Sequence, residues 1–172
     1  VLDVARSELG VRPSDQLRVV LGDARSTTGG LPEDSFDLVV GDAFGGLAVP
    51  WQLTTREFLG QIDRVLRPNG RYVMNVIDYP PLRFVRAEAA TARTMFRHVA
   101  IIADPPSLSG RSGGNFVVVA AHRPIDVPDV LDRSRRWGDV AGVLAGKEVD
   151  DFVGDARILT DDFAPVDQLL GR

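Results

Sequence analysis

The chain has 172 residues, enough for one domain with a buried core, and its 44% hydrophobic and 26% charged content excludes a disordered chain. Its formal net charge of −4 argues against nucleic acid and anionic membranes as partners, because both require a basic surface. The chain has no Cys and only two His, which excludes disulfides and thiolate chemistry and argues against a resident metal.

The hydrophobic pattern alternates between helix-like and strand-like segments. An opening helical pattern begins at Val1 and ends at Gly10. Five apolar runs then predict strands, at 17–21, 36–40, 71–77, 99–103 and 116–121. Helical patterns lie between them at about 54–66 and 82–96, and helical patterns return after Pro124, at 127–137 and 140–153.

This alternation predicts an open α/β sheet of the Rossmann type with mostly parallel strands. The connection between the last two strands, residues 104–114, has no helical period. We therefore expect these two strands to form an antiparallel hairpin at the edge of the sheet. No linker interrupts the chain, so we expect one domain with a helical tail after residue 124.

Three of the predicted strands are followed by an aspartate, namely Asp23, Asp42 and Asp78. Asp is common in turns and helix caps, which is the alternative interpretation of each one. Ligands of open α/β sheets bind at the carboxyl ends of the strands. We therefore expect the three carboxylates to converge on one cleft that suits an amine substrate and a hydroxyl-bearing cofactor. Glycines flank Asp42, where they form a turn or let a ligand approach the backbone.

Five sequence segments occur in order along nearly the whole chain. They are LRVVLGDA at 17–24, FDLVVGD at 36–42, LTTREF at 53–58, VLRPNG at 65–70 and LTDDFAPVD at 159–167. In this order they resemble the spermidine synthase family, the polyamine aminopropyltransferases, and especially its divergent bacterial branch. Single segments are shared with many class I methyltransferases, so the ordered series carries the resemblance.

The resemblance implies a class I methyltransferase-type sheet with a site for decarboxylated S-adenosylmethionine. Asp23 and Ala24 match the pair that holds the adenine. Pro50 falls near the family's loop proline on the cofactor side. The resemblance thus assigns these three residues to cofactor binding and assigns no metal.

On the substrate side, Asp42 matches the aspartate that accepts the proton, and Asn75 matches a strand-end glutamine near the substrate. Asp78, at the same predicted edge, is a second substrate-binding candidate. An acceptor amine with a pKa of ~10 is protonated at neutral pH and must lose its proton before it attacks. A carboxylate at Asp42 suits that step.

The chain departs from the family pattern in three places. Gly45 stands where the catalytic loop has a second Asp, and Ser107 and Leu108 occupy the region of the family's Tyr. The family's first strand, Gly-rich cofactor loop and ribose-binding acid are expected before Val1. Without a neighbouring strand, the backbone at 17–21 would lack hydrogen-bond partners. We therefore expect that the chain is incomplete or that another chain completes its sheet.

The leading hypothesis is a spermidine synthase-like transferase that moves an aminopropyl group to a polyamine acceptor such as putrescine. Residues 1–124 would form the C-terminal portion of its methyltransferase-like catalytic domain, and 125–172 the helical tail. The alternatives are a methyltransferase that uses intact S-adenosylmethionine on a small substrate and a non-catalytic module that retains the fold. The resemblance favours a homodimer, and the absence of any apolar run near ~20 residues and of a signal peptide predicts a cytoplasmic protein.

Overall fold

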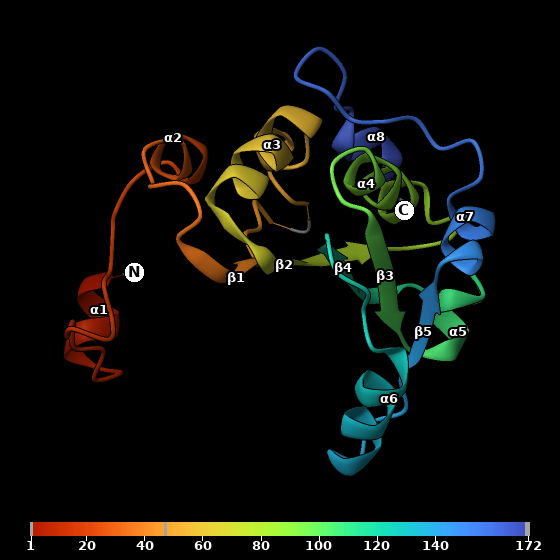
Figure 1. The fold of residues 1–172 in the computed structure, drawn as a ribbon, viewed down its shortest axis with the longest axis horizontal. Coiled ribbons are helices and arrows are strands. Elements are labelled where there is room, and N and C mark those ends of the chain that lie inside the picture. The colour runs from red at the N-terminus through yellow and green to blue at the C-terminus, as the bar shows by residue number, and fades with distance from the viewer. Residues whose placement is uncertain (1, 47, 171–172) are drawn as a thin grey trace.

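An open five-stranded sheet lies at the centre of the computed structural model, which describes residues 2–46 and 48–170 (Figure 1). The strands are β1 (Phe36–Gly41), β2 (Leu66–Asp78), β3 (His98–Ala103), β4 (Gly114–Ala121) and β5 (Gly142–Ala145). Their order across the sheet is β1-β2-β4-β3-β5. The predicted open α/β class is confirmed.

The pairing of the strands differs from the expectation of a mostly parallel sheet. β1 pairs with β2 in parallel, whereas β2 with β4, β4 with β3 and β3 with β5 are antiparallel pairs, so the described sheet is mixed. The antiparallel hairpin of β3 and β4 is confirmed. It is not at the edge, however, because β4 lies between β2 and β3, and β5 occupies the edge.

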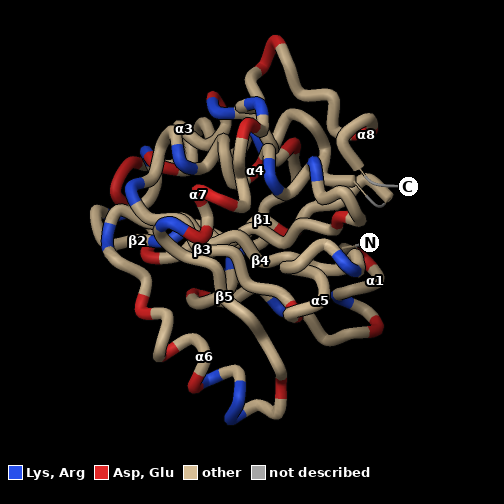
Figure 2. Tube along the Cα trace, turned by 90° about the vertical axis from the view of Figure 1, so that its right-hand side faces the viewer, with Lys and Arg blue, Asp and Glu red and all other residues tan. Residues whose placement is uncertain are grey.

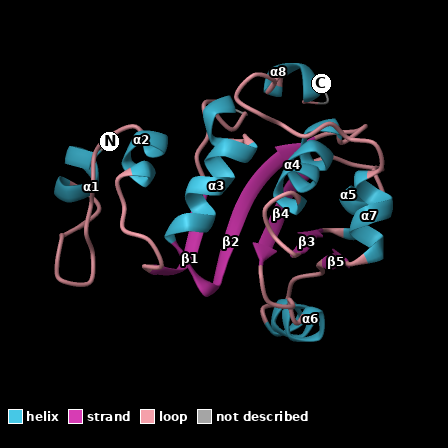
Figure 3. Cartoon of the chain, turned by 45° about the horizontal axis from the view of Figure 1, so that its top comes forward, coloured by secondary structure: helices cyan, strands magenta, loops and turns pink. Residues whose placement is uncertain are grey.

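The helices and turns connect these strands. They are α1 (Leu2–Ser7), α2 (Ala24–Gly29), the 3-10 turn η1 (Trp51–Leu53), α3 (Arg56–Val65), α4 (Arg83–Arg93), α5 (Pro105–Leu108), α6 (Val127–Arg136), α7 (Lys147–Val153) and α8 (Val166–Leu169). Helices α3 and α4 lie over the same face of the sheet, while α6 projects away from it (Figure 3). None of the described helices is long and apolar enough to cross a membrane.

The core forms between α3, α4 and one face of β2. Helix α3 buries four apolar side chains at helical spacing, Phe58, Leu59, Ile62 and Val65. On β2, alternate residues face the helices, so Tyr72, Met74 and Val76 are buried together with them. Burial of each large apolar side chain contributes ~1.5–3 kcal/mol, which makes this layer the rigid base on which the neighbouring loops are placed.

The segment after residue 124 is not purely helical as expected. Residues 142–145 form β5, which pairs with β3 through partners such as Leu144 and Ile101. Gly138 and Gly146 flank this segment with positive φ angles of 76° and 55°. These left-handed residues break the helical pattern on both sides, and a four-residue apolar run cannot be assigned to helix or strand by periodicity alone.

Helix α6 is held by charge pairs along its own exposed surface. Arg133 pairs with Asp129 and Arg136 pairs with Asp132, each at a spacing of four residues. Figure 2 shows acidic and basic residues mixed along this helix and over much of the chain, without a large region of one sign. Such exposed pairs contribute only ~0.3–0.5 kcal/mol each, and α6 buries no residue, so this helix adds little to the core.

The strand expected at 17–21 does not form. Leu17, Val20 and Leu21 are exposed, Leu21 to 77%, and the described residues provide no strand that pairs with this segment or with the outer edge of β1. A strand needs a neighbour to satisfy its backbone, so an apolar run alone is insufficient. The helix expected from Val1 to Gly10 is observed as α1, which buries no residue and lies apart from the sheet in Figure 1; Val1 itself falls outside the described residues.

Asp78 starts α4 from the end of β2. Its Oδ2 accepts hydrogen bonds from the backbone N–H groups of Phe84 and Val85 at 2.9 and 3.0 Å, and its Oδ1 accepts one from Tyr79 N–H at 2.8 Å. Leu82 directly precedes the helix, and its apolar side chain cannot accept a hydrogen bond to cap it. The fully buried Asp78 therefore acts as the helix cap, which is the alternative interpretation from the sequence.

A second polar connection ties the C-terminal segment to α2 and α3. Both terminal nitrogens of Arg25 donate to the carboxylate of Asp161, at 2.8 and 2.6 Å. The hydroxyl of Thr55, the residue that caps α3, donates to the same carboxylate at 2.7 Å. The hydrogen bond from Arg25 lowers the pKa of Asp161 below its ordinary value. Three distant segments are thereby held together at one point.

The cap formed by Asp78 predicts a large loss of stability when it is removed. Asp78→Ala leaves buried N–H groups at the start of α4 without their acceptor, so the free energy of unfolding should fall by ~2–3 kcal/mol. Asp78→Asn keeps one acceptor oxygen, so its free energy of unfolding should lie between those of Asp78→Ala and the wild type. Urea unfolding measures all three, with the exposed Asp155→Ala as the control. A loss from Asp78→Ala no larger than that of the control would contradict the assignment.

The Arg25–Asp161 pair predicts a pH-dependent contribution. Asp161→Asn should lower the free energy of unfolding by ~1 kcal/mol near neutral pH, a modest value because the pair is partly exposed to solvent. The pKa of Asp161 is lower in the folded chain than its ordinary 3.8. The contribution of the pair to the free energy of unfolding is therefore complete above pH 3.8 and is lost as pH falls through the folded-state pKa. The difference between wild type and Asp161→Asn in urea unfolding should therefore shrink in acid. A difference that is constant with pH would contradict this.

Candidate functional site

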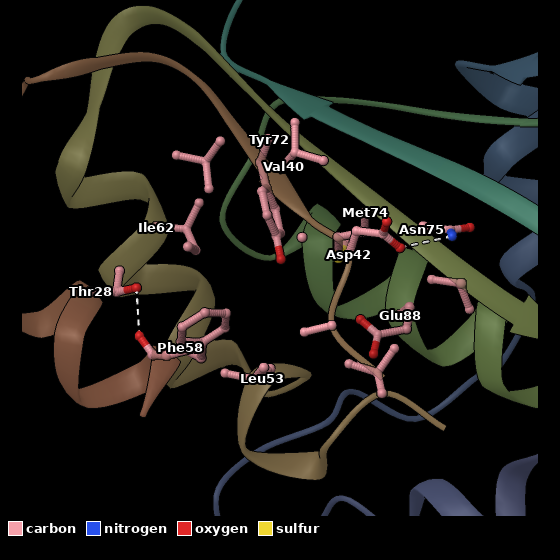
Figure 4. Close-up of a pocket in the computed structure, with 16 residues that line it drawn as sticks. Thr28, Val40, Asp42, Leu53, Phe58, Ile62, Tyr72, Met74, Asn75 and Glu88 are labelled. Atoms are coloured by element: carbon pink, nitrogen blue, oxygen red, sulfur yellow. Dashed lines mark hydrogen bonds between the residues drawn. The ribbon is translucent and has the colours of Figure 1, made fainter. Parts of the chain in front are cut away.

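A cavity of about 220 Å³ lies at the carboxyl end of β1, lined from β1, β2, α2, α3 and α4 (Figure 4). Most of its lining is aliphatic or aromatic, and its polar groups are few. The polar side chains that line it are those of Thr28, Asp42, Tyr72, Asn75 and Glu88. An apolar cavity with a few convergent polar groups is the arrangement typical of a small-molecule site.

The parallel register of β1 and β2 brings two of the predicted site residues together. Gly41 lies opposite Met74, so the residues that follow, Asp42 and Asn75, are neighbours across the two strands. The side-chain nitrogen of Asn75 donates a hydrogen bond to Asp42 Oδ1 at 3.0 Å (Figure 4). Asp42 is exposed. Its carboxylate is therefore oriented by Asn75 and still accessible to a ligand.

The predicted pair Asp23 and Ala24 lies at the start of α2, where only Ala24 lines the cavity. Asp23 is the helix cap, and its carboxylate accepts a hydrogen bond from Ser26 N–H at 2.8 Å. This backbone hydrogen bond from Ser26 lowers the pKa of Asp23. Ala24 and Asp42 thus share one cavity, while the Asp23 side chain serves the helix beside it.

The expected convergence of three aspartates on one cleft is wrong. Asp42 lines the cavity, but Asp23 caps α2 and the buried Asp78 caps α4, so Asp78 is not available as a substrate-binding group. Pro50, assigned to cofactor binding by the resemblance, does not line this cavity. It precedes η1 and lines a separate hollow together with Trp51 and Val166.

The glycines around Asp42 serve packing and turn geometry. A Cβ on Gly41 would lie 2.5 Å from the hydroxyl oxygen of Tyr72, so this glycine makes room for a side chain of the adjacent strand. Gly45 N–H donates to the carbonyl of Ala48 at 2.7 Å, and Gly46 has a φ of 85°. Gly45 therefore belongs to a turn, and the left-handed backbone at Gly46 favours glycine there.

Glu88 is a candidate functional residue that the sequence interpretation missed. It lies on α4, is 1% exposed and lines the cavity, and neither carboxyl oxygen has a hydrogen-bond partner. Burial raises the pKa of Glu88 well above its ordinary value. Burial, and secondarily the Glu88 carboxyl, also raises the pKa of the Tyr72 hydroxyl. A signal was present in the sequence, because Glu88 falls at helical spacing with Phe84 and Val85 on the apolar face of α4.

The lining of the cavity limits which ligands it suits. No Lys, Arg or His lines it among the described residues, which disfavours phosphate groups. In the part of the chain that the structure describes, no group of three or more His, Asp or Glu could hold a metal ion. Acidic groups set among apolar side chains suit a ligand that carries a positive nitrogen or sulfur on an apolar body.

The chain is similar in structure to known transferase folds. It matches the crystal structure of a probable spermidine synthase from Corynebacterium glutamicum with a TM-score of 0.84 and 27% identity, over 96% of this chain and 61% of that one. It also matches human methyltransferase-like protein 13 in complex with SAH, with a TM-score of 0.58 and 18% identity, over 98% of this chain and 73% of that one. The second likeness shows the fold alone. No family model and no curated protein sequence matches.

The chain thus spans about 61% of the length of the bacterial neighbour. The structural match covers nearly all of this chain, as does the ordered series of sequence segments that resembles the same family. The resemblance in sequence segments and the structural match therefore indicate the same group. The chain is a spermidine synthase-like protein with the methyltransferase fold.

Proposed function

We propose that this chain provides the amine-activating part of an aminopropyltransferase that uses decarboxylated S-adenosylmethionine and a polyamine acceptor such as putrescine. The observation that carries the proposal is the accessible carboxylate of Asp42, oriented by Asn75 at an apolar cavity that Ala24 also lines. The likeness to the bacterial protein supports the same interpretation.

In this proposal, Asp42 prepares the acceptor amine. A primary amine with a pKa of ~10 arrives protonated, and its nitrogen has no lone pair for attack. The hydrogen bond from Asn75 uses Asp42 Oδ1, and Oδ2 receives the proton from the ammonium group. The free lone pair then forms the new nitrogen–carbon bond as the carbon–sulfur bond breaks.

The lining of the cavity suits part of the other reactant, because its volume of about 220 Å³ is below the ~300–1,000 Å³ typical of ligands of that size. Ala24, Leu53 and Phe58 provide an apolar wall for the adenine, and Asp42 stabilises positive charge at the rim. Decarboxylated S-adenosylmethionine supplies an aminopropyl group on a sulfonium whose departure leaves a neutral thioether. Because no anion forms, the residues contribute mainly by positioning the reactants and excluding water.

Methyl transfer from intact S-adenosylmethionine is the second candidate. Gly45 favours it, because this residue forms part of a tight turn and offers no second carboxylate for a polyamine on that loop. The two candidates share Asp42 as the base and differ in the group that is transferred. They are therefore separated by the mass of the product.

Replacement of Asp42 tests the proposal. With decarboxylated S-adenosylmethionine and putrescine, the wild-type chain should form a product heavier by one aminopropyl group, and Asp42→Asn should lower the rate by at least ~100-fold, the usual contribution of a general base. The control is Asp37→Asn, an exposed residue of β1 that pairs with Arg67. Mass spectrometry of the products measures both. Full activity of Asp42→Asn would remove Asp42 as the base, and methylated product from the intact cofactor would favour the second candidate.

A further inference from the structure

We propose that Glu88 binds one nitrogen of a short aliphatic diamine whose other nitrogen lies at Asp42, which makes Glu88 the residue that selects diamines over monoamines. This inference takes the role of Asp42 from the proposed function. It goes further by assigning the choice between diamines and monoamines to a specificity residue on a different element of the fold.

The first step is the isolation of Glu88 inside the protein. Its side chain is 1% exposed, and both carboxyl oxygens are without a hydrogen-bond partner. Figure 4 shows the carboxyl group directed from α4 toward the residues that line the cavity. Burial of a polar group without a partner is costly, so such groups are rare in native proteins unless a ligand uses them.

The second step is the charge of the surroundings. The titratable side chains that face the cavity with Glu88 are Tyr72 from β2 and Asp42 after β1, and no cationic side chain lines it among the described residues. An anionic ligand would meet two carboxyl groups and, in the described part of the chain, no cation to pair with. A positively charged nitrogen, in contrast, would pair with Glu88 and supply the hydrogen bonds that its oxygens lack.

The third step is the size and lining of the cavity. Its volume of about 220 Å³ is below the ~300–1,000 Å³ typical of drug-sized ligands and suits a small aliphatic molecule. Val40 and Met74 are among the apolar residues that line it together with the two carboxylates, so methylene groups would contact apolar side chains. Asp42 is exposed and Glu88 is buried, which places one nitrogen at the rim and the other in the interior.

The protonation state of Glu88 links binding to proton release. Burial raises the pKa of Glu88 well above its ordinary value, which favours the neutral acid while the cavity is empty. An ammonium group beside Glu88 favours the carboxylate, and the proton of the acid passes to solvent. Tyr72, whose pKa is also raised, remains protonated. Binding of a diamine should therefore release up to one proton per chain.

Calorimetry with two amines tests the inference without any cofactor. Putrescine and 1-butylamine have the same carbon chain, and only putrescine has the second nitrogen. The wild-type chain should bind putrescine at least ~10-fold more tightly, the effect expected of a charge-assisted hydrogen bond, and Glu88→Gln should reduce this ratio to about threefold or less. The matched control is Glu148→Gln, an exposed glutamate on α7, which should keep the wild-type ratio.

Each outcome of this titration is decisive. An unchanged ratio in Glu88→Gln, or no binding of putrescine by the wild type, would overturn the inference. Titration in buffers of different ionisation enthalpy should show proton release in the wild type and none in Glu88→Gln. If Glu88 controls diamine binding but no group is transferred, the proposed function fails and the inference stands. If transfer occurs and Glu88→Gln keeps the diamine preference, the inference about Glu88 fails and the proposed function stands.

Thermal unfolding checks that Glu88→Gln folds and gives a second readout. The pKa of Glu88 in the folded chain is raised above its ordinary 4.5. The contribution of the neutral acid to stability is therefore complete below pH 4.5 and is lost as pH rises toward the folded-state pKa. The melting temperature of Glu88→Gln minus that of the wild type should therefore increase from acid to neutral pH. Putrescine should raise the melting temperature of the wild type more than that of Glu88→Gln. Equal stabilisation of both by putrescine would count against the inference.

Discussion

The parallel pairing of β1 with β2 is the constraint on which the candidate site depends. One register, with Gly41 opposite Met74, sets Asp42 beside Asn75 and directs both toward the cavity. A shift of one residue would turn each side chain to the other face of the sheet. The buried layer of α3, α4 and β2 holds this register, so the chemistry at the rim depends on packing beneath it.

Helix N-termini use two of the three aspartates that were expected from the sequence at one cleft. Every helix begins with N–H groups that lack partners inside the helix, and Asp23 and Asp78 are used to satisfy them at α2 and α4. Glu88 is the opposite case, a carboxyl group inside the core that no backbone group uses. A structural role accounts for the first two residues and leaves Glu88 without one, which is why it is the stronger functional candidate.

The described sheet ends at β1, and the chain matches only part of the bacterial structure. The structural match covers almost all of this chain and about 61% of the other. At the edge of β1 the described residues provide no further strand, and Leu17, Val20 and Leu21 of the apolar segment at 17–21 are exposed. The site described here is thus formed by the part of the sheet that β1 and β2 build, together with α2, α3 and α4.

The sequence by itself determined the strands at β1 to β4, the helices α3 and α4 and the hairpin, because these depend on local periodicity. The ordered series of segments also named Asp42 and Asn75 as separate site candidates, and the register of β1 and β2 brought them into contact. Only the tertiary structure decided which aspartates cap helices, that 17–21 stays outside the sheet and that 142–145 enters it. It also showed that Glu88 lines the cavity without a partner. The physical reason is that hydrogen-bond partners and neighbouring strands come from distant parts of the chain, which local patterns do not specify.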